Sequence, residues 1–314
     1  MSQERDFSRA PGSARISVLY EEHLLLSATF GDRLASRPPV PSAYGDGSGE
    51  LAALERGTAL SDLSGMACLL FSGPAATGFA HAAFAGRELA VGECAFECVL
   101  MGDGRLASVP LLARTGDEEF AVLDASPRSQ LLASWLTFLA NVESGGVEPY
   151  RDLVAENVTG SLVPLLLAGA DATAIASDYL PEGAVLPARG QVRSIALDGR
   201  IASLVARVDP VPTAAASGRG AATGVAHAGR PAVAGPAYLL LVPPDSARTV
   251  WRSLLSFESL APVGEEALRH HLVARVPWAS WLDGGPEGPL AARDLVAAGI
   301  ARPQMDFVGA RGLA

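Results

Sequence analysis

The sequence predicts an α+β protein made of two units with a similar plan. The chain has 314 residues, and domains usually span about 100–200 residues, so two units are expected. Hydrophobic residues make up 49% of the chain and charged residues 18%, which allows a sizeable core. A polar turn, an apolar strand, a small-residue corner and a helix follow one another in each half. We therefore expect a first unit at 16–150 and a second at 151–314, packed as a pseudo-symmetric pair.

The first elements follow from local signals. Residues 1–15 are polar and are expected to form a disordered tail. Glu50 to Arg56 has the composition of a short helix. Ala67 to Phe71 is a continuous apolar run of strand length. Ser72-Gly73-Pro74 then starts a helix, with Ser72 as its candidate cap and a proline near the first turn.

The rest of the first unit is expected to form a hairpin, a strand and a helix. Phe96 to Leu100 and Leu106 to Ala113 predict paired strands around the turn Gly102-Asp103-Gly104. Phe120 to Asp124 predicts a further strand. Ser126-Pro127 then opens a helix, whose apolar stripe at a period of 3.6 comprises Leu131, Leu132, Trp135, Leu136 and Leu139.

The second half repeats this order. The polar turn Ser61 to Gly65 and its strand correspond to Glu156 to Gly160 and the strand that ends at Ala168. The strand Phe120 to Asp124 and its helix correspond to Tyr238 to Val242 and a helix with Trp251. The later spacing is wider because 212–235 forms an Ala/Gly/Pro-rich insertion, which we expect to be flexible.

Composition excludes several classes of partner. The net charge is −10 and the pI about 5.0, so no basic surface for nucleic acid is expected. The longest apolar stretches, such as Leu162 to Ala170, are far shorter than the roughly 18–20 residues that span a bilayer. The first residues carry acids and resemble no secretory signal. Three cysteines fit a reducing compartment, so we expect a cytoplasmic protein.

The chain contains no lysine, since all 24 basic residues are arginine. This absence excludes a phosphate-binding loop of the Walker type, which uses a lysine on the phosphates. It also excludes a lysine-anchored pyridoxal phosphate.

Local catalytic motifs are missing as well. There is no Gly-x-Ser-x-Gly turn and no His-Glu-x-x-His pair, and the five histidines do not group as metal ligands, so no metal is expected. Cys94 and Cys98 share a strand face with Phe96 in the predicted hairpin, where burial is the expected fate of both thiols. The glycine-rich run 218–224 has the wrong spacing for a dinucleotide loop.

A resemblance carries more information than these motifs. Gly57-Thr-Ala-Leu-Ser-Asp-Leu-Ser-Gly-Met66, followed by Ser72-Gly-Pro-Ala-Ala76, is similar to the first domain of the glycine cleavage T-protein family of folate-dependent aminomethyltransferases. Gly92 to Arg105 resembles the strand and Asn-x-x-Gly-Gly turn of that family. Asp294 to Gly299 and Asp306-Phe-Val-Gly309 resemble its final segments. The similarity runs from about Leu19 to the C-terminus.

The resemblance implies two pseudo-repeated folate-site domains. It also implies that the third domain of the family, a small β-barrel, would begin after Gly309, close to the last residue, Ala314. We therefore expect the chain to lack the barrel. The face that the barrel would cover is then expected to meet a protein partner or a second copy of the chain.

The resemblance also implies site residues, several of them altered. The catalytic acid of the family falls near Ser108, which hydrogen-bonds but carries no charge at neutral pH. The family tyrosine falls at Phe96, and the family asparagine at Asp124. Met66 is kept. Arg269 falls where the family holds the glutamate tail of folate, a task that suits a guanidinium group.

Two functions are compatible with these residues. The first is a tetrahydrofolate-dependent aminomethyltransferase-like protein, whose activity the loss of its acids would degrade. The second is a non-catalytic folate-binding or scaffold subunit of a one-carbon or demethylase assembly. In both, Met66 and Phe96 would pack on the cofactor, and Ser108, Asp124 and Arg269 would supply polar contacts.

Overall fold

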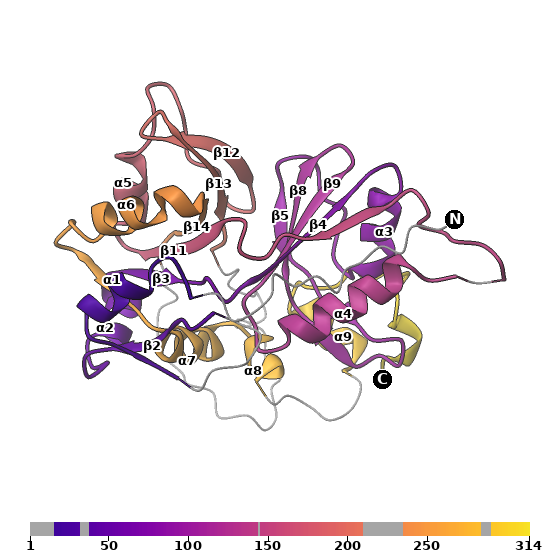
Figure 1. Cartoon of the computed structure of the whole chain (residues 1–314). Helices are drawn as coiled ribbons and strands as arrows, with labels where there is room; N and C mark the ends of the chain where they lie inside the picture. The colour runs from indigo at the N-terminus through magenta and orange to yellow at the C-terminus, as the bar shows by residue number, and fades with distance from the viewer. Residues whose placement is uncertain (1–15, 32–37, 144, 210–234, 284–289) are drawn as a thin grey trace.

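Two β-sheets organise the chain (Figure 1). The computed structural model describes residues 16–31, 38–143, 145–209, 235–283 and 290–314. The predicted tail at 1–15 and the predicted insertion, except for Gly235, lie outside the described residues.

The first sheet has five antiparallel strands. Their order across the sheet is β10 (Val154–Asn157), β4 (Ala67–Ser72), β9 (Glu119–Asp124), β8 (Leu111–Gly116) and β5 (Cys94–Phe96). Helices α3 (Ala76–Ala83) and α4 (Ser129–Ala140) cover one face of it. Leu132 and Leu136 of the predicted helical stripe pack there on Phe71 and Phe79. Burial of these side chains fixes the position of both helices, because each large apolar group removed from water contributes about 1.5–3 kcal/mol.

The second sheet has six strands. Their order is β12 (Val192–Leu197), β13 (Ile201–Arg207), β14 (Ala237–Val242), β11 (Val163–Gly169), β3 (Thr58–Asp62) and β15 (Leu260–Pro262). Helices α5 (Ala172–Ser177) and α6 (Pro244–Leu254) pack on one face, where Trp251 is fully buried.

The two sheets repeat one topology and exchange one strand each. Strands β10, β4, β9, β8 and β5 of the first sheet correspond in order to β3, β11, β14, β13 and β12 of the second. Strand β3 precedes β4 in the sequence but pairs with β11, and β10 precedes β11 but pairs with β4. The predicted repeat is therefore present, and the exchange ties the two halves together.

The faces of the sheets that carry no helix share one apolar cluster. Strand β14 shows how, since its side chains alternate between faces. Tyr238 and Leu240 pack towards α6. Leu239 and Leu241 pack on the other face with Cys68 and Leu123 of the first sheet and with Met66, which precedes β4. Both faces of β14 are thus buried, which explains the continuous apolar run that predicted this strand.

The remaining segments cross between the halves. Helix α1 (Tyr20–Leu25), strands β1 (Ala28–Phe30) and β2 (Pro41–Tyr44), helix α2 (Glu50–Arg56) and helix α7 (Glu265–Arg275) lie with the second sheet. A further apolar cluster lies beside the first sheet. It is built by the short strands β6 (Val99–Leu100) and β7 (Leu106–Ser108), the helices α8 (Ala279–Leu282) and α9 (Ala292–Ala297), and the 3₁₀ helix Ala310–Gly312.

Three local expectations need correction. The two halves are not the consecutive blocks 16–150 and 151–314, because Leu19, Tyr44 and Leu60 pack with the second sheet, whereas Leu295, Ile300 and Phe307 pack beside the first. Ser61 and Asp62 end strand β3 rather than form a turn. Ser72 ends β4 and does not cap α3, which starts at Ala76 without a side-chain cap. None of the helices among the described residues is long and apolar enough to cross a membrane.

Candidate functional site

Four of the five site residues predicted from the resemblance gather at one end of the first sheet. Phe96 of β5 pairs with Leu111, and Leu111 pairs with Leu123 of β9. Asp124 follows Leu123 and pairs with Ala67, next to Met66. Ser108 reaches the same point by a hydrogen bond to Asp124. The antiparallel register therefore brings together residues that are far apart in the sequence.

Ser108 and Asp124 are buried and bound to each other. Their exposed fractions are 0% and 3%. The Ser108 hydroxyl donates to Asp124 Oδ2 at 2.7 Å, and the backbone N–H of Ser126 donates to Oδ1 at 2.8 Å. A hydroxyl and a carboxylate that satisfy each other in this way stabilise the fold. Met66 is also buried, in the cluster between the sheets.

Arg269 lies apart from this group. It is on α7, its side chain is 55% exposed, and it forms an ion pair with Asp283 at 3.3 Å. Phe96 reaches towards the same region, because its ring centroid lies 5.1 Å from that of Trp278, between α7 and α8. Phe96 is half-buried, so one side of this aromatic pair is accessible.

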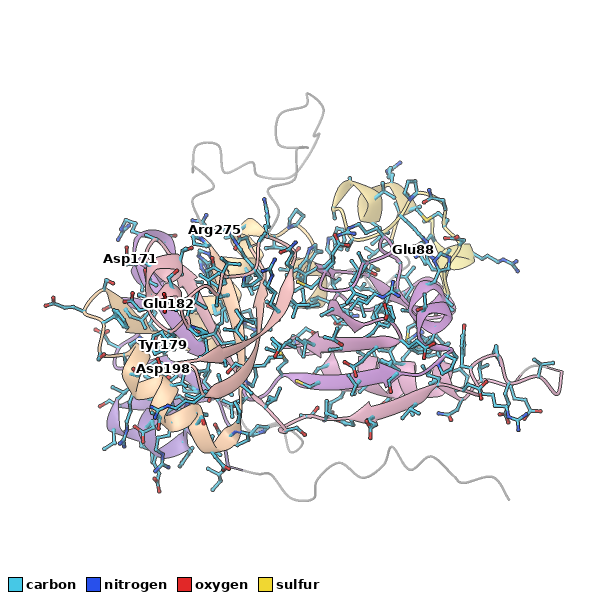
Figure 2. The ribbon with its side chains drawn as sticks, turned by 90° about the horizontal axis from the view of Figure 1, so that it is seen from above. Glu88, Asp171, Tyr179, Glu182, Asp198 and Arg275 are labelled. Carbon is cyan, nitrogen blue, oxygen red and sulfur yellow. The ribbon has the colours of Figure 1, made fainter. Side chains whose placement is uncertain are left out.

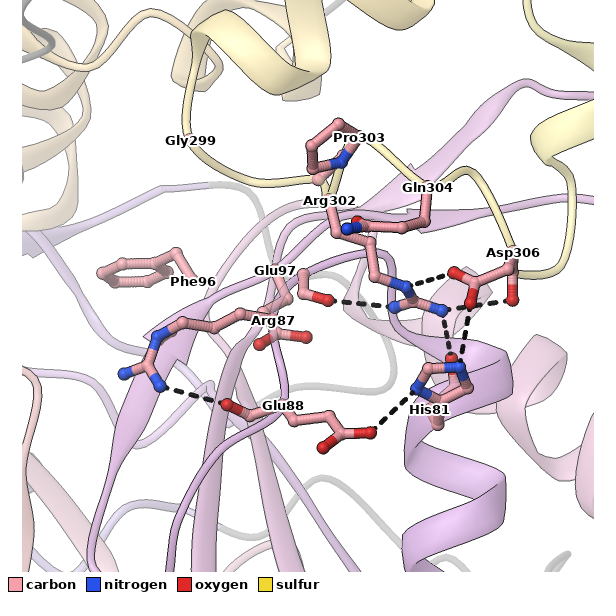
Figure 3. Close-up of a pocket in the computed structure, with 13 residues that line it drawn as sticks. His81, Arg87, Glu88, Phe96, Glu97, Gly299, Arg302, Pro303, Gln304 and Asp306 are labelled. Carbon is pink, nitrogen blue, oxygen red and sulfur yellow. Dashed lines mark hydrogen bonds and ion pairs between the residues drawn. The ribbon is translucent and has the colours of Figure 1, made fainter.

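A pocket of about 550 Å³ opens beside Phe96 (Figure 3). Its wall includes the loop after α3, the end of β5 and the segment that follows α9. Figure 2 shows the pocket residue Glu88 in one half of the molecule and Tyr179 and Asp198 in the other half. The residues that line the pocket are His81, Gly86, Arg87, Glu88, Ala95, Phe96, Glu97, Gly299, Ala301, Arg302, Pro303, Gln304 and Asp306.

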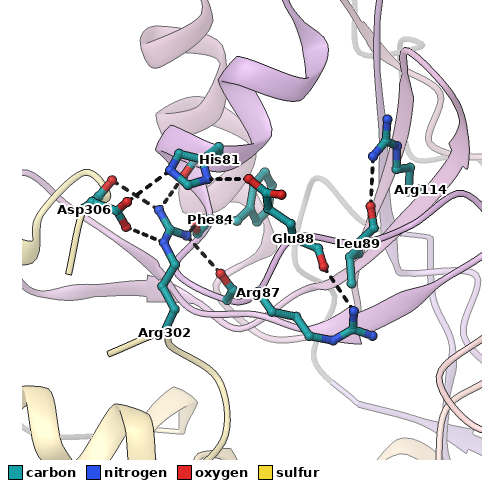
Figure 4. Close-up of polar contacts among 9 residues, drawn as sticks. His81, Phe84, Arg87, Glu88, Leu89, Arg114, Arg302 and Asp306 are labelled. Carbon is teal, nitrogen blue, oxygen red and sulfur yellow. Dashed lines mark hydrogen bonds and ion pairs between the residues drawn. The ribbon is translucent and has the colours of Figure 1, made fainter. Parts of the chain in front are cut away.

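Arg302 holds the C-terminal segment against α3 (Figure 4). Its side chain is 10% exposed. Nε donates to Asp306 Oδ1, and the two terminal nitrogens donate to four backbone carbonyls, those of His81, Phe84, Gly86 and Asp306, at 2.7–3.1 Å. A guanidinium group has five N–H donors, so these five bonds use its whole capacity.

Glu97 is a buried acid, and one of its two carboxyl oxygens has no hydrogen-bond partner. It is 2% exposed, and the unpaired oxygen is Oε1. Its carboxyl lies directly against Gly86, where an added Cβ would clash with Glu97 Cδ. Burial raises the pKa of Glu97 to about 8, and a backbone hydrogen bond from Gly86 and the charges of Arg302 and Arg87 oppose that rise only in part.

The raised pKa of Glu97 has a consequence for stability. The unfolded chain releases this proton near pH 4.3, whereas the folded chain keeps it up to about pH 8. Between these values the folded state holds the extra proton, so the free energy of unfolding should fall as the pH rises, by up to about 1.4 kcal/mol per unit.

Urea denaturation between pH 6.5 and 8 checks this prediction, because below about pH 6.5 His271, whose pKa burial lowers to about 4, adds a slope of opposite sign. Glu97→Gln should remove the slope, and Glu88→Gln, whose side chain is 82% exposed, should keep it. Equal slopes in the wild type and in Glu97→Gln would show that Glu97 titrates at its ordinary value.

The cysteines are not part of a reactive site. All three are buried, and burial raises the pKa of Cys68 and of Cys94 to about 12 and that of Cys98 further still. Their thiols are therefore protonated at neutral pH and unsuited to nucleophilic attack. Cys94 and Cys98 pack in different clusters, because the predicted strand is interrupted at Glu97.

The sequence interpretation missed Glu97, His81 and Arg302. Glu97 had a signal, because it is the one acid inside the apolar run Cys94 to Leu100. His81 and Arg302 had none, since they lie 221 positions apart in the sequence and only the fold brings them together. Among the described residues, no group of three or more His, Cys, Asp or Glu side chains could hold a metal ion.

Comparisons with known proteins identify the fold. No family model and no curated protein sequence matches the chain. Among solved structures, the chain is similar to the glycine cleavage system aminomethyltransferase T from Bartonella henselae, with a TM-score of 0.68 and 20% identity over 96% of this chain and 74% of that one. A weaker match, with a TM-score of 0.43 and 16% identity, is the heterotetrameric sarcosine oxidase from Corynebacterium sp. U-96; it covers 77% of this chain and 93% of that chain. The chain therefore has an aminomethyltransferase T-like fold, as the sequence predicted.

Proposed function

From this shared fold, we propose that the protein binds a folate-type cofactor, tetrahydrofolate, and takes part in one-carbon metabolism. The observation that carries the proposal is the fold itself, which matches aminomethyltransferase T over 96% of the chain. The family resemblance in the sequence supports the same cofactor. Four of the residues it implicates, Met66, Phe96, Ser108 and Asp124, lie at one end of one sheet.

The aromatic pair Phe96 and Trp278 is the best candidate to hold the flat ring of the cofactor. The two rings are tilted by 44° at 5.1 Å, and both are half-buried. Aromatic faces of this kind stack on planar ligands. Arg269 would take the glutamate tail. Its pair with Asp283 is exposed, and such pairs contribute only about 0–1 kcal/mol, so a ligand carboxylate can replace Asp283.

The buried pair Ser108 and Asp124 favours binding over catalysis. In the family an acid at the position of Ser108 would act on the folate nitrogen, whereas here the Ser108 hydroxyl donates a hydrogen bond to Asp124 inside the core. Stabilising a developing positive charge requires an available anion near the reacting atom. We therefore favour a non-catalytic folate-binding or scaffold subunit, and we expect any aminomethyl transfer to be slow. A cytoplasmic location and a protein partner remain part of this proposal.

Thermal denaturation with added tetrahydrofolate tests the proposal. A ligand that binds the folded state alone adds about 2.7 kcal/mol of stability at about 100 times its Kd. We expect a rise in Tm that grows with the tetrahydrofolate concentration. The tail fragment p-aminobenzoylglutamate, which lacks the pterin ring, should give a smaller rise.

The Arg269→Ala variant tests the tail contact in the same assay. It should reduce the rise in Tm, whereas Arg293→Ala, whose side chain is 87% exposed, should not. An unchanged Tm at millimolar tetrahydrofolate would count against any folate role, and an equal rise in both variants would remove Arg269 from the site.

A further inference from the structure

We propose that the pocket beside Phe96 binds a small protonated amine, whose ammonium group donates a hydrogen bond to the Glu97 carboxylate. This site is separate from the aromatic pair proposed for the folate ring, although Phe96 borders both. It goes beyond the proposed function, because neither the resemblance nor the fold assigns a role to Glu97.

The first step of the argument is the unpartnered carboxyl oxygen. Glu97 is 2% exposed, and Oε1 has no hydrogen-bond partner although the side chain lines a pocket of about 550 Å³. Buried polar atoms are nearly always paired, so a buried oxygen left free at a cavity requires an explanation. A ligand donor in the cavity supplies one.

The second step is that the nearby cations are already engaged. All five donors of Arg302 go to Asp306 and to backbone carbonyls. Arg87 is turned towards Glu93, with a bond of 2.7 Å. The sequence has no lysine that could supply an ammonium group. His81, the other possible cation of the wall, lies against Glu88 and Asp306. Each described cation that lines the pocket therefore has an acidic neighbour other than Glu97, and a ligand can supply the positive charge that pairs with Glu97.

The third step is the character of the pocket wall. Ala95, Phe96, Ala301 and Pro303 offer apolar surface for the carbon part of an amine, and an aromatic face attracts a nearby cation. The rim carries further acid, because the side chains of Glu88 and Asp306 are 82% and 50% exposed. The two arginines of the wall are paired, Arg302 with Asp306 and Arg87 with Glu93, so Glu88 and Glu97 are the acids that remain to attract a positive ligand (Figure 3).

The protonation state of Glu97 adds a measurable signature. Burial favours the neutral form of Glu97 at pH 7, because it raises the pKa of this acid to about 8. A bound ammonium ion favours the carboxylate, so the Glu97 proton leaves to solvent as the amine binds. Below pH 8 the affinity should then rise about ten-fold per pH unit. The titratable and charged groups that face Glu97 or its pocket are His81, Arg87, Glu88, Cys98, Arg302 and Asp306.

Three probes of matched shape test the proposal by calorimetry on the full chain. Benzylammonium carries a ring, a charge and N–H donors, benzyltrimethylammonium lacks the donors, and benzyl alcohol lacks the charge. We expect saturable binding of benzylammonium and binding at least about ten-fold weaker for the other two, the loss of one charge-assisted hydrogen bond. Glu97→Gln should weaken benzylammonium binding to the same extent and abolish its pH dependence, whereas Glu258→Gln, at an exposed position outside the pocket, should change neither by more than about two-fold.

The outcomes decide the proposal either way. Absence of saturable benzylammonium binding, equal binding by the wild type and Glu97→Gln, or benzyl alcohol binding as tightly as benzylammonium would each overturn it. Glu97→Gln replaces an acid by a group of nearly the same shape, and its far-ultraviolet circular dichroism shows whether it folds. Tetrahydrofolate binding by the same variant keeps the two proposals distinct, since it should match that of the wild type whether or not the amine binds.

Discussion

Replacing Arg302 by methionine is expected to lower the free energy of unfolding by about 3–5 kcal/mol. The guanidinium group is 10% exposed and serves three backbone carbonyls after and within α3, as well as Asp306 and its carbonyl. Its removal leaves the backbone carbonyls of His81, Phe84 and Gly86 without this donor, and each buried acceptor left unpaired costs about 1–3 kcal/mol. The segment that follows α9 should also become accessible to proteolysis.

Urea denaturation of Arg302→Met and of a matched control measures this effect. Arg105→Met removes an arginine that is 60% exposed and paired with Asp103, so its cost should stay below about 1 kcal/mol. A loss below about 1 kcal/mol for Arg302→Met as well would mean that the apolar cluster of Leu295, Ile300 and Phe307 alone holds the segment.

Replacing Asp62 by alanine is expected to have a similar cost, about 3–5 kcal/mol. Asp62 ends strand β3 and is 5% exposed. It accepts from His23 Nε2 at 2.8 Å and from the backbone N–H of Ser64 at 2.8 Å. A carboxylate can only accept, so Nε2 carries a proton; in the neutral ring Nδ1 then accepts from the Tyr44 hydroxyl at 2.9 Å. Burial raises the pKa of Tyr44, so this hydroxyl remains a donor.

The hydrogen bonds from Tyr44 to His23 and from His23 to Asp62 fasten helix α1 and strand β2 to the exchanged strand β3. Truncation would leave a fully buried histidine without its acceptor, next to the Trp251 ring at 5.0 Å. Differential scanning calorimetry should show the loss for Asp62→Ala and a smaller loss for Asp62→Asn, which keeps one acceptor oxygen. Asp46→Ala, at an exposed turn, should unfold at nearly the same temperature as the wild type. Equal stability of Asp62→Ala and Asp46→Ala would show that the chain of hydrogen bonds carries no net stabilisation.

Local periodicity of apolar residues predicted the helices and strands well where one or both faces of the element are buried. The helix at Glu50–Arg56 has the expected bounds, and the apolar stripe placed the helix that spans Ser129–Ala140. The run Tyr238 to Val242 is a strand because both of its faces are buried. These patterns depend on neighbours along the chain, which a sequence displays directly.

Pairing between distant segments could not be predicted in this way. Nothing in Thr58–Asp62 shows that it pairs with Leu165 to Gly169 rather than with the strand that follows it, because either partner would bury the same side chains. The same holds for Arg302, whose acceptors are backbone carbonyls that have no sequence signature. The family resemblance placed Met66, Phe96, Ser108 and Asp124 near one another, and the role of each in binding stays a prediction.

Calorimetric titration of tetrahydrofolate into the wild type, Phe96→Ala and Phe138→Ala tests most directly whether this fold keeps a folate site. Phe138 is a matched control, since it is an aromatic residue that is 58% exposed on α4. We predict one saturable site in the wild type, an affinity at least about ten-fold lower in Phe96→Ala, and an unchanged affinity in Phe138→Ala. Absence of saturable heat in the wild type, or equal affinity in all three proteins, would contradict the assignment.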